Sequence, residues 1–495
     1  MNALRQMTYN SSVIRSALGC GEVHSSLLPN DVSPQAAESL RKEIGFNKIE
    51  SIRDEMEPST SRLTREAGLP TDAKIKGRPR VLISAYTCLA NAGQRFPGGG
   101  DLMAWNVIRR LGRTCDIWVV TCDKNRAAIE AKLSKEPVSG VEFHFVGLPR
   151  WMTPLLGAMG TLQFYAYLWQ WAAYFAARRL HRHVRFDLAH HLTYTNDWMA
   201  SVIGARLPVP YVRGPGGGAH RIPPPFLRQF SFGARFAEAF RSFGQWVFRH
   251  DPFFLLSQSR AKVIFACNHE AVEGVAARWR SKVRLLSVNG ISADELAPPH
   301  PHVRGEKFRV LSAGRLVPLK GFDLAVRAFK TFSDKCPNAE FTIVGDGPEL
   351  PVLQKLIRDL RLEASVRVEK WMPREQVLSA MRDCDVFVFL SLRDGGGLVV
   401  IEAMAGGRPV ICLALGGPGL HTVEGCGIKI PAHSPEQVVR ETAAALELLE
   451  KDRDLCERLG GGARQRAAEV YDWDRVSGQI METYEDVLVA RSSEA

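Results

Sequence analysis

The sequence predicts an α/β protein built on open parallel sheets. Apolar, strand-like runs alternate with amphipathic helical segments through residues 308–430, which is the pattern of a parallel sheet covered by helices. Glycine turns join strand to helix at residues 314–321 and 395–397, and such turns let backbone amides approach a ligand closely. Because 495 residues exceed the size of a single hydrophobic core, we expect two domains.

The chain begins with a polar extension that is followed by a first glycine loop. Residues 1–77 are polar and charged, so we expect a partly disordered N-terminal extension. Residues 80–86 and 116–121 are predicted to be buried strands, with a helix over residues 102–111 between them. The loop before that helix holds Gly99 and Gly100, directly after a strand, where nucleotide-binding folds place glycines.

Two aromatic segments of the first half raise the question of a membrane. Residues 151–177 carry no charged side chain and are long enough to span a bilayer, but two glycines and two glutamines favour a buried or interfacial helix. In residues 223–254, phenylalanines recur at helical spacing with arginines between them. This face would either rest on anionic lipid and present a lipid-linked acceptor, or cover the first domain.

The second half opens with two cations beside a helix start. Residues 310–329 predict a strand, a glycine turn and a helix, with Arg315 and Lys320 in the turn. Fixed cations at this position can neutralise a leaving diphosphate. Residues 297–307 are rich in proline and histidine, and we expect the boundary between the two domains there.

A later glycine turn is flanked by two acids. Residues 386–411 predict an apolar strand, three glycines and a short helix, with Asp394 before the glycines and Glu402 inside the helix. Glu402 can accept hydrogen bonds from a ribose diol. The groups expected to surround a diphosphate are the backbone amides at this helix start, those of Gly396, Gly397, Leu398 and Val399.

Residues 308–430 resemble the donor-binding domain of the retaining glycosyltransferases of family 4. The family's fold is GT-B, two Rossmann-like domains that face each other across a cleft. Its acid and glutamate, separated by seven residues, correspond to Asp394 and Glu402. Its arginine and lysine that hold the donor diphosphate correspond to Arg315 and Lys320.

Three glycine loops extend the resemblance. The family's Gly-Asp-Gly turn corresponds to residues 345–347, where Gly345 is an expected donor-binding residue, and its Gly-Gly-Pro loop to residues 416–418. Its amino-terminal Gly-Gly loop corresponds to Gly99 and Gly100, which are expected to face the donor phosphate. The resemblance implies an acceptor-side domain over residues 78–292, a donor-binding domain over 308–469, and a helix over 470–490 that crosses back to the first domain.

The resemblance also implies an activity. The protein is expected to transfer a sugar from a nucleoside-diphosphate sugar to a hydroxyl acceptor with retention at the anomeric carbon, in polysaccharide or glycolipid assembly. Arg315 and Lys320 would stabilise the leaving phosphate in place of a metal, and no cofactor is expected. Residues 185–218 resemble a subgroup with a histidine that approaches the transferred sugar; His191 is preferred for this role, and His190 remains open.

Departures from the family pattern keep other functions open. The family usually has glutamate followed by Gly-Phe-Gly where this chain has Asp394 and three glycines, which favours a non-catalytic homologue that binds nucleotide sugar. Sugar-nucleotide epimerases with the GT-B fold are a second alternative. Asp383 and Asp385 have the Asp-x-Asp form of metal-binding glycosyltransferases, but they lie at a helix-to-strand junction, and no metal is expected.

Composition is consistent with a large cytoplasmic enzyme. A net charge of +11 fits a phosphate-rich donor or an anionic membrane surface, and the dispersed basic residues argue against nucleic acid. The ten cysteines form no Cys-x-x-Cys pair and several fall in predicted strands, as reduced core cysteines do. Residues 1–19 lack an apolar core, so no secretory signal is expected. We expect a cytoplasmic protein, peripheral on the inner face of the membrane.

Overall fold

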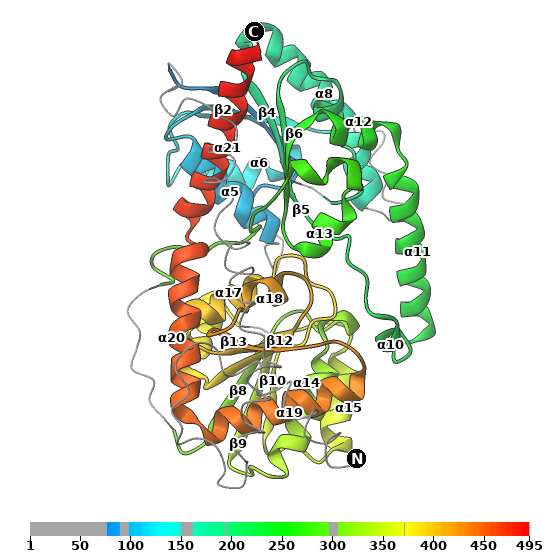
Figure 1. The fold of residues 1–495 in the computed structure, drawn as a ribbon, viewed down its shortest axis with the longest axis vertical. Coiled ribbons are helices and arrows are strands. Elements are labelled where there is room, and N and C mark those ends of the chain that lie inside the picture. The colour runs from blue at the N-terminus through cyan, green and yellow to red at the C-terminus, as the bar shows by residue number, and fades with distance from the viewer. Residues whose placement is uncertain are drawn as a thin grey trace, which may run out of the picture. The chain divides into compact units, whose positions relative to one another are not determined.

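The computed structural model describes residues 77–89, 99–149, 162–193, 196–296, 305–370 and 372–494. Most of the predicted N-terminal extension and most of the predicted boundary at 297–307 lie outside these residues. The described chain contains two parallel sheets that are separate in sequence, as Figure 1 shows.

The first sheet is formed by the amino-terminal half of the chain. Its strand order is β3-β2-β1-β4-β5-β6-β7, and every pairing is parallel. β1 pairs with β2 from Arg80 opposite Asp116 onward. The strands are β1 (Arg80–Ala85), β2 (Asp116–Cys122), β3 (Val141–Val146), β4 (Leu188–Thr193), β5 (Tyr211–Gly216), β6 (Ala261–Ala266) and β7 (Val283–Leu285).

Helices cover this sheet and connect its strands. They are α5 (Gly99–Leu111), α6 (Arg126–Leu133), α8 (Leu162–Val184), α9 (Val202–Arg206), α10 (Pro224–Leu227), α11 (Phe232–Arg249), α12 (Pro252–Arg260) and α13 (His269–Gly274), with short 3₁₀ turns η1 (Asp123–Asn125) and η2 (Ala277–Lys282). The first of them begins at Gly99 rather than at the predicted residue 102. Asp101 in its first turn favours this earlier start, because a carboxylate stabilises the positive end of the helix dipole.

The second sheet is formed by the carboxy-terminal half. Its order is β10-β9-β8-β11-β12-β13, again with parallel pairings. The strands are β8 (Phe308–Ala313), β9 (Ala339–Val344), β10 (Val366–Glu369), β11 (Val386–Phe389), β12 (Val410–Leu413) and β13 (Gly427–Ile430). The connecting elements are η3 (Pro318–Lys320), α14 (Phe322–Ser333), α15 (Leu350–Asp359), α16 (Arg374–Asp383), α17 (Leu398–Ala405), α18 (Gly416–His421) and α19 (Pro435–Lys451).

Both sheets are buried on two faces, which explains their nearly continuous apolar strands. Five of the six residues of β1 and all four of β11 are buried. In the second domain, the rings of Phe329 on α14 and Phe341 on β9 lie 5.4 Å apart between centroids. The nine described cysteines are free thiols, eight of them buried.

The uncharged aromatic segment forms part of the first domain. Within it, α8 begins at Leu162 and packs on the sheet through Trp169, Ala173 and Ala177, all fully buried. Gln170 is also fully buried. Among the described residues, no helix is long and apolar enough to cross a bilayer. The described part of this segment is therefore a helix with one buried side, within the preferred interpretation of a buried or interfacial helix.

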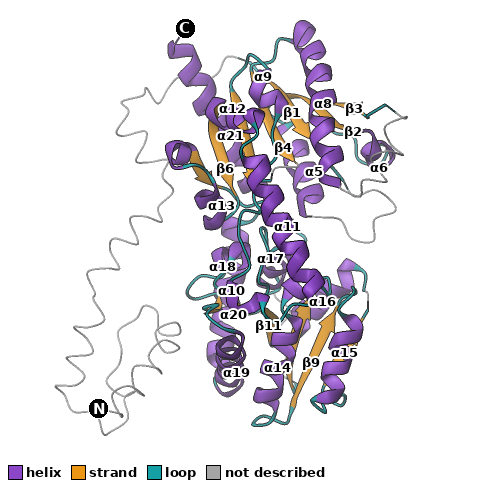
Figure 2. Cartoon of the chain, turned by 90° about the vertical axis from the view of Figure 1, so that its right-hand side faces the viewer, coloured by secondary structure: helices purple, strands orange, loops and turns teal. Residues whose placement is uncertain are grey.

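The segment over residues 223–254 forms three helices instead of one. Pro252 explains the break between α11 and α12, because proline fits a helix start but not its interior. α11, which Figure 2 shows as a separate helix, has its own start, where the Ser231 hydroxyl accepts a hydrogen bond from the Ala234 amide. The Asp251 carboxylate caps α12 by accepting hydrogen bonds from the amides of Phe253 (2.6 Å) and Phe254 (3.1 Å).

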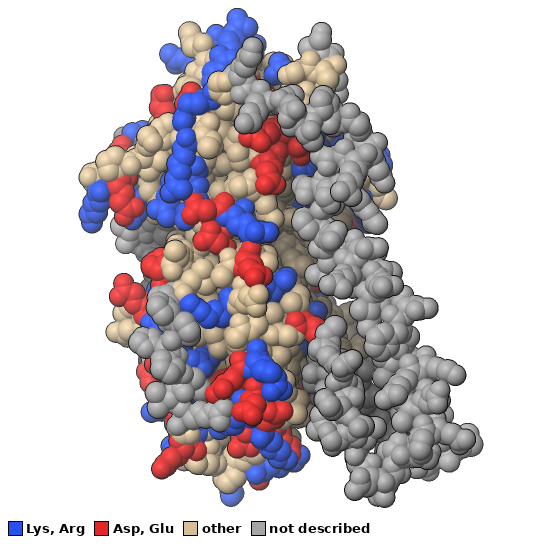
Figure 3. All heavy atoms as spheres, turned by 60° about the vertical axis from the view of Figure 1, so that its left-hand side comes forward, with Lys and Arg blue, Asp and Glu red and all other residues tan. Residues whose placement is uncertain are grey.

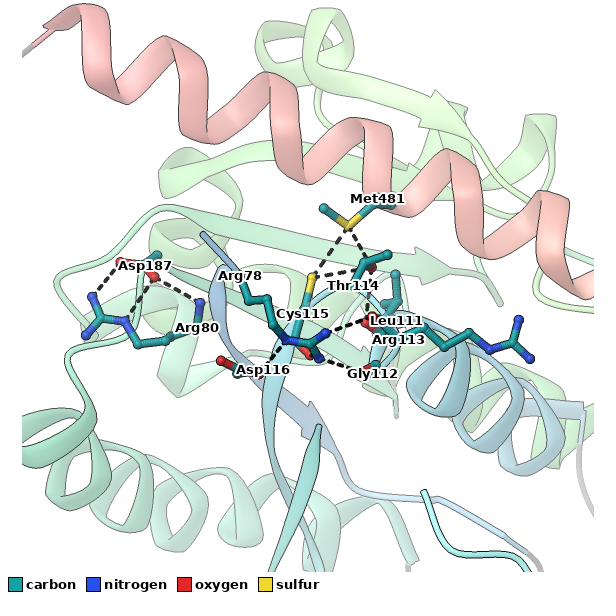
Figure 4. A network of polar contacts seen from close by, with 10 residues as sticks. All are labelled: Arg78, Arg80, Leu111, Gly112, Arg113, Thr114, Cys115, Asp116, Asp187 and Met481. Carbon is teal, nitrogen blue, oxygen red and sulfur yellow. Dashed lines mark hydrogen bonds and ion pairs between the residues drawn. The ribbon is translucent and has the colours of Figure 1, made fainter. Parts of the chain in front are cut away.

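The carboxy-terminal helices return to the first sheet. α20 (Arg453–Val470) packs on the second domain, and α21 (Trp473–Glu494) contacts α5. Arg110 on α5 donates to Asp474 at 2.9 Å, and the thiol of Cys115 lies 3.5 Å from the sulfur of Met481. Figure 4 shows the contact between Cys115 and Met481. It also shows Arg78, which donates hydrogen bonds to the carbonyls of Gly112, Arg113 and Cys115 in the loop before β2.

Charged side chains of both signs are distributed over the face drawn in Figure 3. Basic and acidic residues alternate there, with uncharged residues between them. Ion pairs also occur at the ends of the first sheet, where Arg78 pairs with Asp116 at 2.7 Å and Arg80 with Asp187 at 2.9 Å. The net positive charge is therefore not gathered into one basic field on this face.

Candidate functional site

Two glycine loops of the second domain pack backbone against backbone. The Gly417 amide donates to the Asp394 carbonyl at 2.9 Å. A side chain on Gly416, whose φ is +57°, would begin 2.2 Å from the same carbonyl oxygen. A side chain on Gly397, also at φ +57°, would begin 2.9 Å from Pro418. These glycines are therefore required for contact between the two loops.

The Asp394 carboxylate organises the turn that leads into α17. One oxygen accepts hydrogen bonds from the amides of Gly396 (3.1 Å) and Gly397 (2.8 Å), and the other pairs with the Lys320 ammonium. Burial raises the pKa of Asp394, but Lys320 and the two amides outweigh it, so the pKa lies below its usual value. The carboxylate is thus held ionised.

This arrangement affects the four amides expected to bind a donor, although their contact with a donor stays a prediction. The amides of Gly396 and Gly397 are occupied by Asp394 and do not point freely toward a ligand. The amides of Leu398 and Val399, in the first turn of α17, form no hydrogen bond with another described residue. Because first-turn amides also carry the positive end of the helix dipole, these two are the groups of the set that can receive an anion.

The two expected cations occupy different environments. Lys320 ends η3, and its ammonium also lies over the Phe389 ring, 5.0 Å from the centroid. The next residue, Gly321, has a φ of +64°. A Cβ at this position would lie only 2.2 Å from the Leu390 carbonyl oxygen. Arg315 is exposed, and its side chain forms no hydrogen bond or ion pair with another described residue. The structure therefore brings Lys320 to Asp394 and leaves Arg315 free.

Glu402 lies buried inside α17 and is bound by an arginine that the sequence analysis did not single out. Arg374 donates to one Glu402 oxygen from Nε (3.0 Å) and Nη2 (2.7 Å), and also pairs with Glu295. Burial raises the pKa of Glu402 above its usual value, although Arg374 opposes the shift. Arg374 begins α16 directly after Pro373, and this helix start was the available signal.

The buried side chain of His421 forms hydrogen bonds with the glycine turn and with Tyr471. His421 Nε2 lies 2.7 Å from the Gly396 carbonyl, and Nδ1 lies 2.8 Å from the Tyr471 hydroxyl. Since a carbonyl can only accept, Nε2 is the donor and the Tyr471 hydroxyl donates to Nδ1. Burial lowers the pKa of His421 to about 4, so the ring is neutral near neutral pH.

Side chains of the first domain reach the same loops. The Asn268 amide donates to the Gly395 carbonyl at 3.0 Å, and the Gly416 amide donates to Glu270 at 2.7 Å. Arg393, next to Asp394, pairs with Glu238 of α11 at 2.5 Å. The turn that carries Asp394 is therefore held by both halves of the chain.

His220 is a further residue that the sequence analysis did not identify. Its side chain is buried, and neither ring nitrogen forms a hydrogen bond with a described residue. Nε2 lies 3.7 Å from the position that a Cβ would take on Gly416. Burial lowers its pKa, while Glu270 and, more weakly, Asp394 oppose that shift. The signal was its place two residues after the Gly-Gly-Gly run at 216–218.

The two candidate histidines of the first domain lie within β4. His191 is fully buried, and its Nδ1 lies 3.2 Å from the Ser84 hydroxyl. His190 is also buried, with Nδ1 2.6 Å from the Tyr484 hydroxyl and Nε2 2.6 Å from the Gly214 carbonyl. Burial lowers the pKa of His190 to about 4. His190 thus links β4 to α21, and contact between His191 and a sugar stays a prediction.

The remaining glycines of the predicted site belong to turns. Gly99 and Gly100 form the first residues of α5, and residues 90–98 before them lie outside the described part of the chain. A side chain on Gly345 would begin 2.0 Å from the Gly314 carbonyl. Gly345 therefore allows the loops after β8 and β9 to touch, and its contact with a donor stays a prediction.

The Asp-x-Asp pair is a structural junction. Asp385 is buried and accepts hydrogen bonds from the Arg309 amide (2.6 Å) and from Arg453 Nη1 (2.7 Å), whereas Asp383 is exposed. Within the described ranges, no three His, Cys, Asp or Glu side chains are grouped as a metal site requires.

The sequence of the second half is similar to a known protein family. Residues 295–466 match the family model of glycosyl transferases group 1. This stretch is about a third of the chain. The chain is 30% identical over 234 residues to the D-inositol 3-phosphate glycosyltransferase of Streptomyces bingchenggensis, a match covering 41% of this chain and 50% of the relative. It is 32% identical over 188 residues to the D-inositol 3-phosphate glycosyltransferase of Streptomyces griseus, a match covering 36% of this chain and 39% of the relative. The chain thus spans about half the length or less of these curated relatives.

Solved structures of glycosyltransferases share the fold across both domains. HepE of Anabaena in complex with UDP superposes with a TM-score of 0.56 at 17% identity, over 82% of this chain and all of HepE. WaaG, a glycosyltransferase of lipopolysaccharide biosynthesis, superposes with a TM-score of 0.51 at 15% identity, over 81% of this chain and 99% of WaaG. The predicted α/β fold of the GT-B type, with two Rossmann-like domains, is confirmed.

Proposed function

We propose that this glycosyl transferases group 1 protein transfers a sugar from a nucleoside-diphosphate sugar to a hydroxyl acceptor, with retention at the anomeric carbon and without a metal. One observation carries the proposal above all. The paired side chains of Lys320 and Asp394 lie at the turn that leads to the unoccupied amides of Leu398 and Val399. A cation, a helix start and a fixed carboxylate at one turn suit a sugar diphosphate.

The chemistry follows from where charge develops. As the bond between sugar and diphosphate breaks, the sugar gains oxocarbenium character and the leaving phosphate gains negative charge. Lys320, the exposed Arg315 and the two first-turn amides of α17 would stabilise that charge. The leaving phosphate would accept the proton of the acceptor hydroxyl, so no protein nucleophile is assigned.

Arg374 and Glu402 would bind the nucleoside end of the donor. Arg374 fixes the Glu402 carboxylate with two hydrogen bonds, which orients it to accept from a ribose diol. HepE, which shares the fold, was solved with UDP, and that supports a nucleoside diphosphate as the class of donor.

The proposal is tested by a screen of nucleotide sugars, measuring thermal shift and product formation for the wild type and for Glu402→Ala. We expect one donor to stabilise the wild type, weaker stabilisation of the variant, and release of nucleoside diphosphate only when an acceptor is present. Binding without any turnover would identify a non-catalytic homologue. Conversion of the donor sugar without an acceptor would identify an epimerase. Loss of turnover in EDTA that manganese restores would contradict metal independence.

The acceptor is proposed to be a lipid-linked or oligosaccharide hydroxyl, and the location the cytoplasmic face of a membrane. The support is the orientation of α11. Three of its polar side chains face the protein, since Gln245 donates to the Gly218 carbonyl at 3.0 Å, Arg241 to the His220 carbonyl at 3.2 Å, and Glu238 pairs with Arg393. The outer side is aromatic.

The outer side of α11 fits an anionic membrane surface. Its exposed side chains are Phe232, Phe236, Phe240, Phe243 and Trp246, each at least 59% exposed. Arg221, Arg228 and Arg235 are exposed beside them, and Glu238, the acid within residues 221–250, is turned inward into ion pairs. Aromatic side chains with arginines and no exposed acid suit the headgroup region of anionic lipid.

A further inference from the structure

We propose that a cavity in the first domain binds a small amphiphilic anion, a carboxylate or phosphate group with a hydrocarbon part. The cavity has a volume of about 330 Å³ and is lined by residues of β5, β6, α12, α13 and the end of α11. Figure 1 shows α12, β6 and α13 as neighbours in this domain. No residue of the Asp394 turn or of residues 416–418 lines it, so it is a site separate from the proposed donor site.

A buried arginine supplies the first binding group. Arg213 on β5 is 2% exposed, and its Nη2 donates to the carbonyls of Asn196 (2.6 Å) and Met199 (2.9 Å). Its other terminal nitrogen, Nη1, is buried and forms no hydrogen bond with a described residue. The Arg213 guanidinium is thus held in place by two hydrogen bonds, and its Nη1 donor is unpaired at the wall of the cavity.

Two more unpaired groups line the same cavity. Nε and Nη2 of Arg249, at the end of α11, are buried without a hydrogen-bond partner among the described residues. The side-chain oxygen of Gln258 on α12 is likewise buried and unpaired, in a residue that is 3% exposed. Buried polar groups in proteins are nearly always paired, so three such residues around one cavity point to a ligand.

The charged side chains of the cavity walls favour an anion as the ligand. Arg213, Arg249 and Arg278 line the cavity together with a single carboxylate, that of Asp197. Asp197 accepts from the Ala219 amide at 2.9 Å, and the charges of Arg213 and Arg249 oppose the rise that burial causes in its pKa, although neither lies within 4.0 Å of it. The excess is therefore positive. Planar guanidinium groups bind carboxylate and phosphate through paired hydrogen bonds.

The remaining walls of the cavity indicate that the ligand also has an apolar part. They are apolar and include Phe254, Leu255, Ile264, Phe265, Val275 and Trp279. A bare inorganic ion would leave this surface in contact with water, whereas a short hydrocarbon chain would cover it. The combination fits a molecule with one anionic end and one apolar end.

The proposal is tested by isothermal titration calorimetry on the full chain, with hexyl phosphate and hexanoate as probes. We expect saturable binding of at least one probe at one site per chain, and binding of hexanol and inorganic phosphate at least about 10-fold weaker. The same probe should bind equally well when UDP is present. Competition with UDP would place the anion in the donor site and overturn the proposal. Because the readout is binding, it is independent of glycosyl transfer.

Variants separate this site from nonspecific attraction. Arg249→Gln removes donors that have no partner within the described chain, so the fold should persist while probe affinity falls about 10-fold or more. Ala276→Trp places a large ring in the wall without changing charge, and should also weaken binding. Arg235→Gln, on the exposed side of α11, is the matched control and should bind as the wild type does. Unchanged affinity in both Arg249→Gln and Ala276→Trp, or no binding of either probe, would refute the site.

Discussion

The ammonium of Lys320 and the carboxylate of Asp394 form an ion pair between two turns that lie 74 positions apart in sequence. The pair joins the turn before α14 to the turn before α17, and both side chains are mostly buried. Because Asp394 also accepts from the amides of Gly396 and Gly397, one carboxylate fixes a cation and a helix start together.

Replacement of Asp394 should therefore affect both stability and turnover. We expect Asp394→Ala to cost about 3 kcal/mol of unfolding free energy, since it leaves Lys320 and two amides without their partner. We expect donor turnover to fall about 100-fold, as when a charge-positioning group is removed. Asp394→Glu, which keeps the charge, should recover part of both. Urea unfolding and donor turnover measure the two effects, and wild-type values for Asp394→Ala would rule out this role.

The pairing of Arg374 with Glu402 leads to a second prediction. Arg374→Met would leave a buried carboxylate without its cation, and should cost about 3–5 kcal/mol of stability while weakening donor binding. Arg374→Lys would keep the positive charge but not the two hydrogen bonds to Glu402, so its stability and donor affinity should lie between those of the wild type and Arg374→Met. Arg382→Met on the same helix is a matched control, because Arg382 is not bonded to Glu402. Equal thermal stability of Arg374→Met and Arg382→Met would contradict the prediction.

His220 should contribute to the reaction more than to the fold. Its ring nitrogens have no hydrogen-bond partner in the described chain, so His220→Gln removes no contact that holds the loops. If a ligand at the Asp394 turn is its partner, His220→Gln should leave the melting temperature within about 2 °C and lower kcat/KM about 10- to 100-fold. Steady-state kinetics with the identified donor is the measurement. A large loss of stability with unchanged kcat/KM would show that His220 is structural.

Two buried histidines should make the fold sensitive to acid. The pKa of His190 and that of His421 are lowered by burial from 6.5 to about 4, so between these values the unfolded chain binds more protons than the folded chain. Stability should therefore fall as the pH drops through this window, by about 1.4 kcal/mol per pH unit for each histidine. Urea unfolding at about pH 7 and about pH 4.5 measures the loss.

A matched pair of variants checks the assignment. His421→Gln keeps hydrogen-bonding groups but does not titrate, so it should lose roughly 2–3 kcal/mol less than the wild type over that interval. His183→Gln, at an exposed position near the end of α8, should behave like the wild type. The same acid sensitivity in all three proteins would show that other groups cause it.

The exposed aromatic side of α11 predicts binding to anionic vesicles. The wild type should sediment with vesicles that contain anionic lipid at low salt and much less with zwitterionic vesicles, because aromatic insertion and arginine attraction act together. Phe236→Ser with Phe240→Ser should reduce the bound fraction about 10-fold or more. Val352→Ser, an exposed apolar position on α15, is the control. Equal sedimentation with both vesicle types, or self-association of the wild type in place of lipid binding, would contradict membrane docking.

The sequence alone determined the architecture, because that depends on local patterns. Apolar runs such as β8 and β11 and the glycine turns after them are short-range signals, and they predicted parallel sheets in both halves. They also placed Lys320 and Asp394 in turns. Helix starts were less certain, as at Gly99, because capping depends on only one or two residues.

Only the tertiary structure decided which groups meet. The pairs Lys320–Asp394 and Arg374–Glu402 depend on the order of strands in the sheet, which periodicity does not encode. The occupation of the Gly396 and Gly397 amides by Asp394, and the inward polar side of α11, follow from how side chains share limited space and hydrogen bonds. A sequence names the groups that can bind or react, but their partners are set by long-range packing, because burial forces each polar group to find a partner nearby.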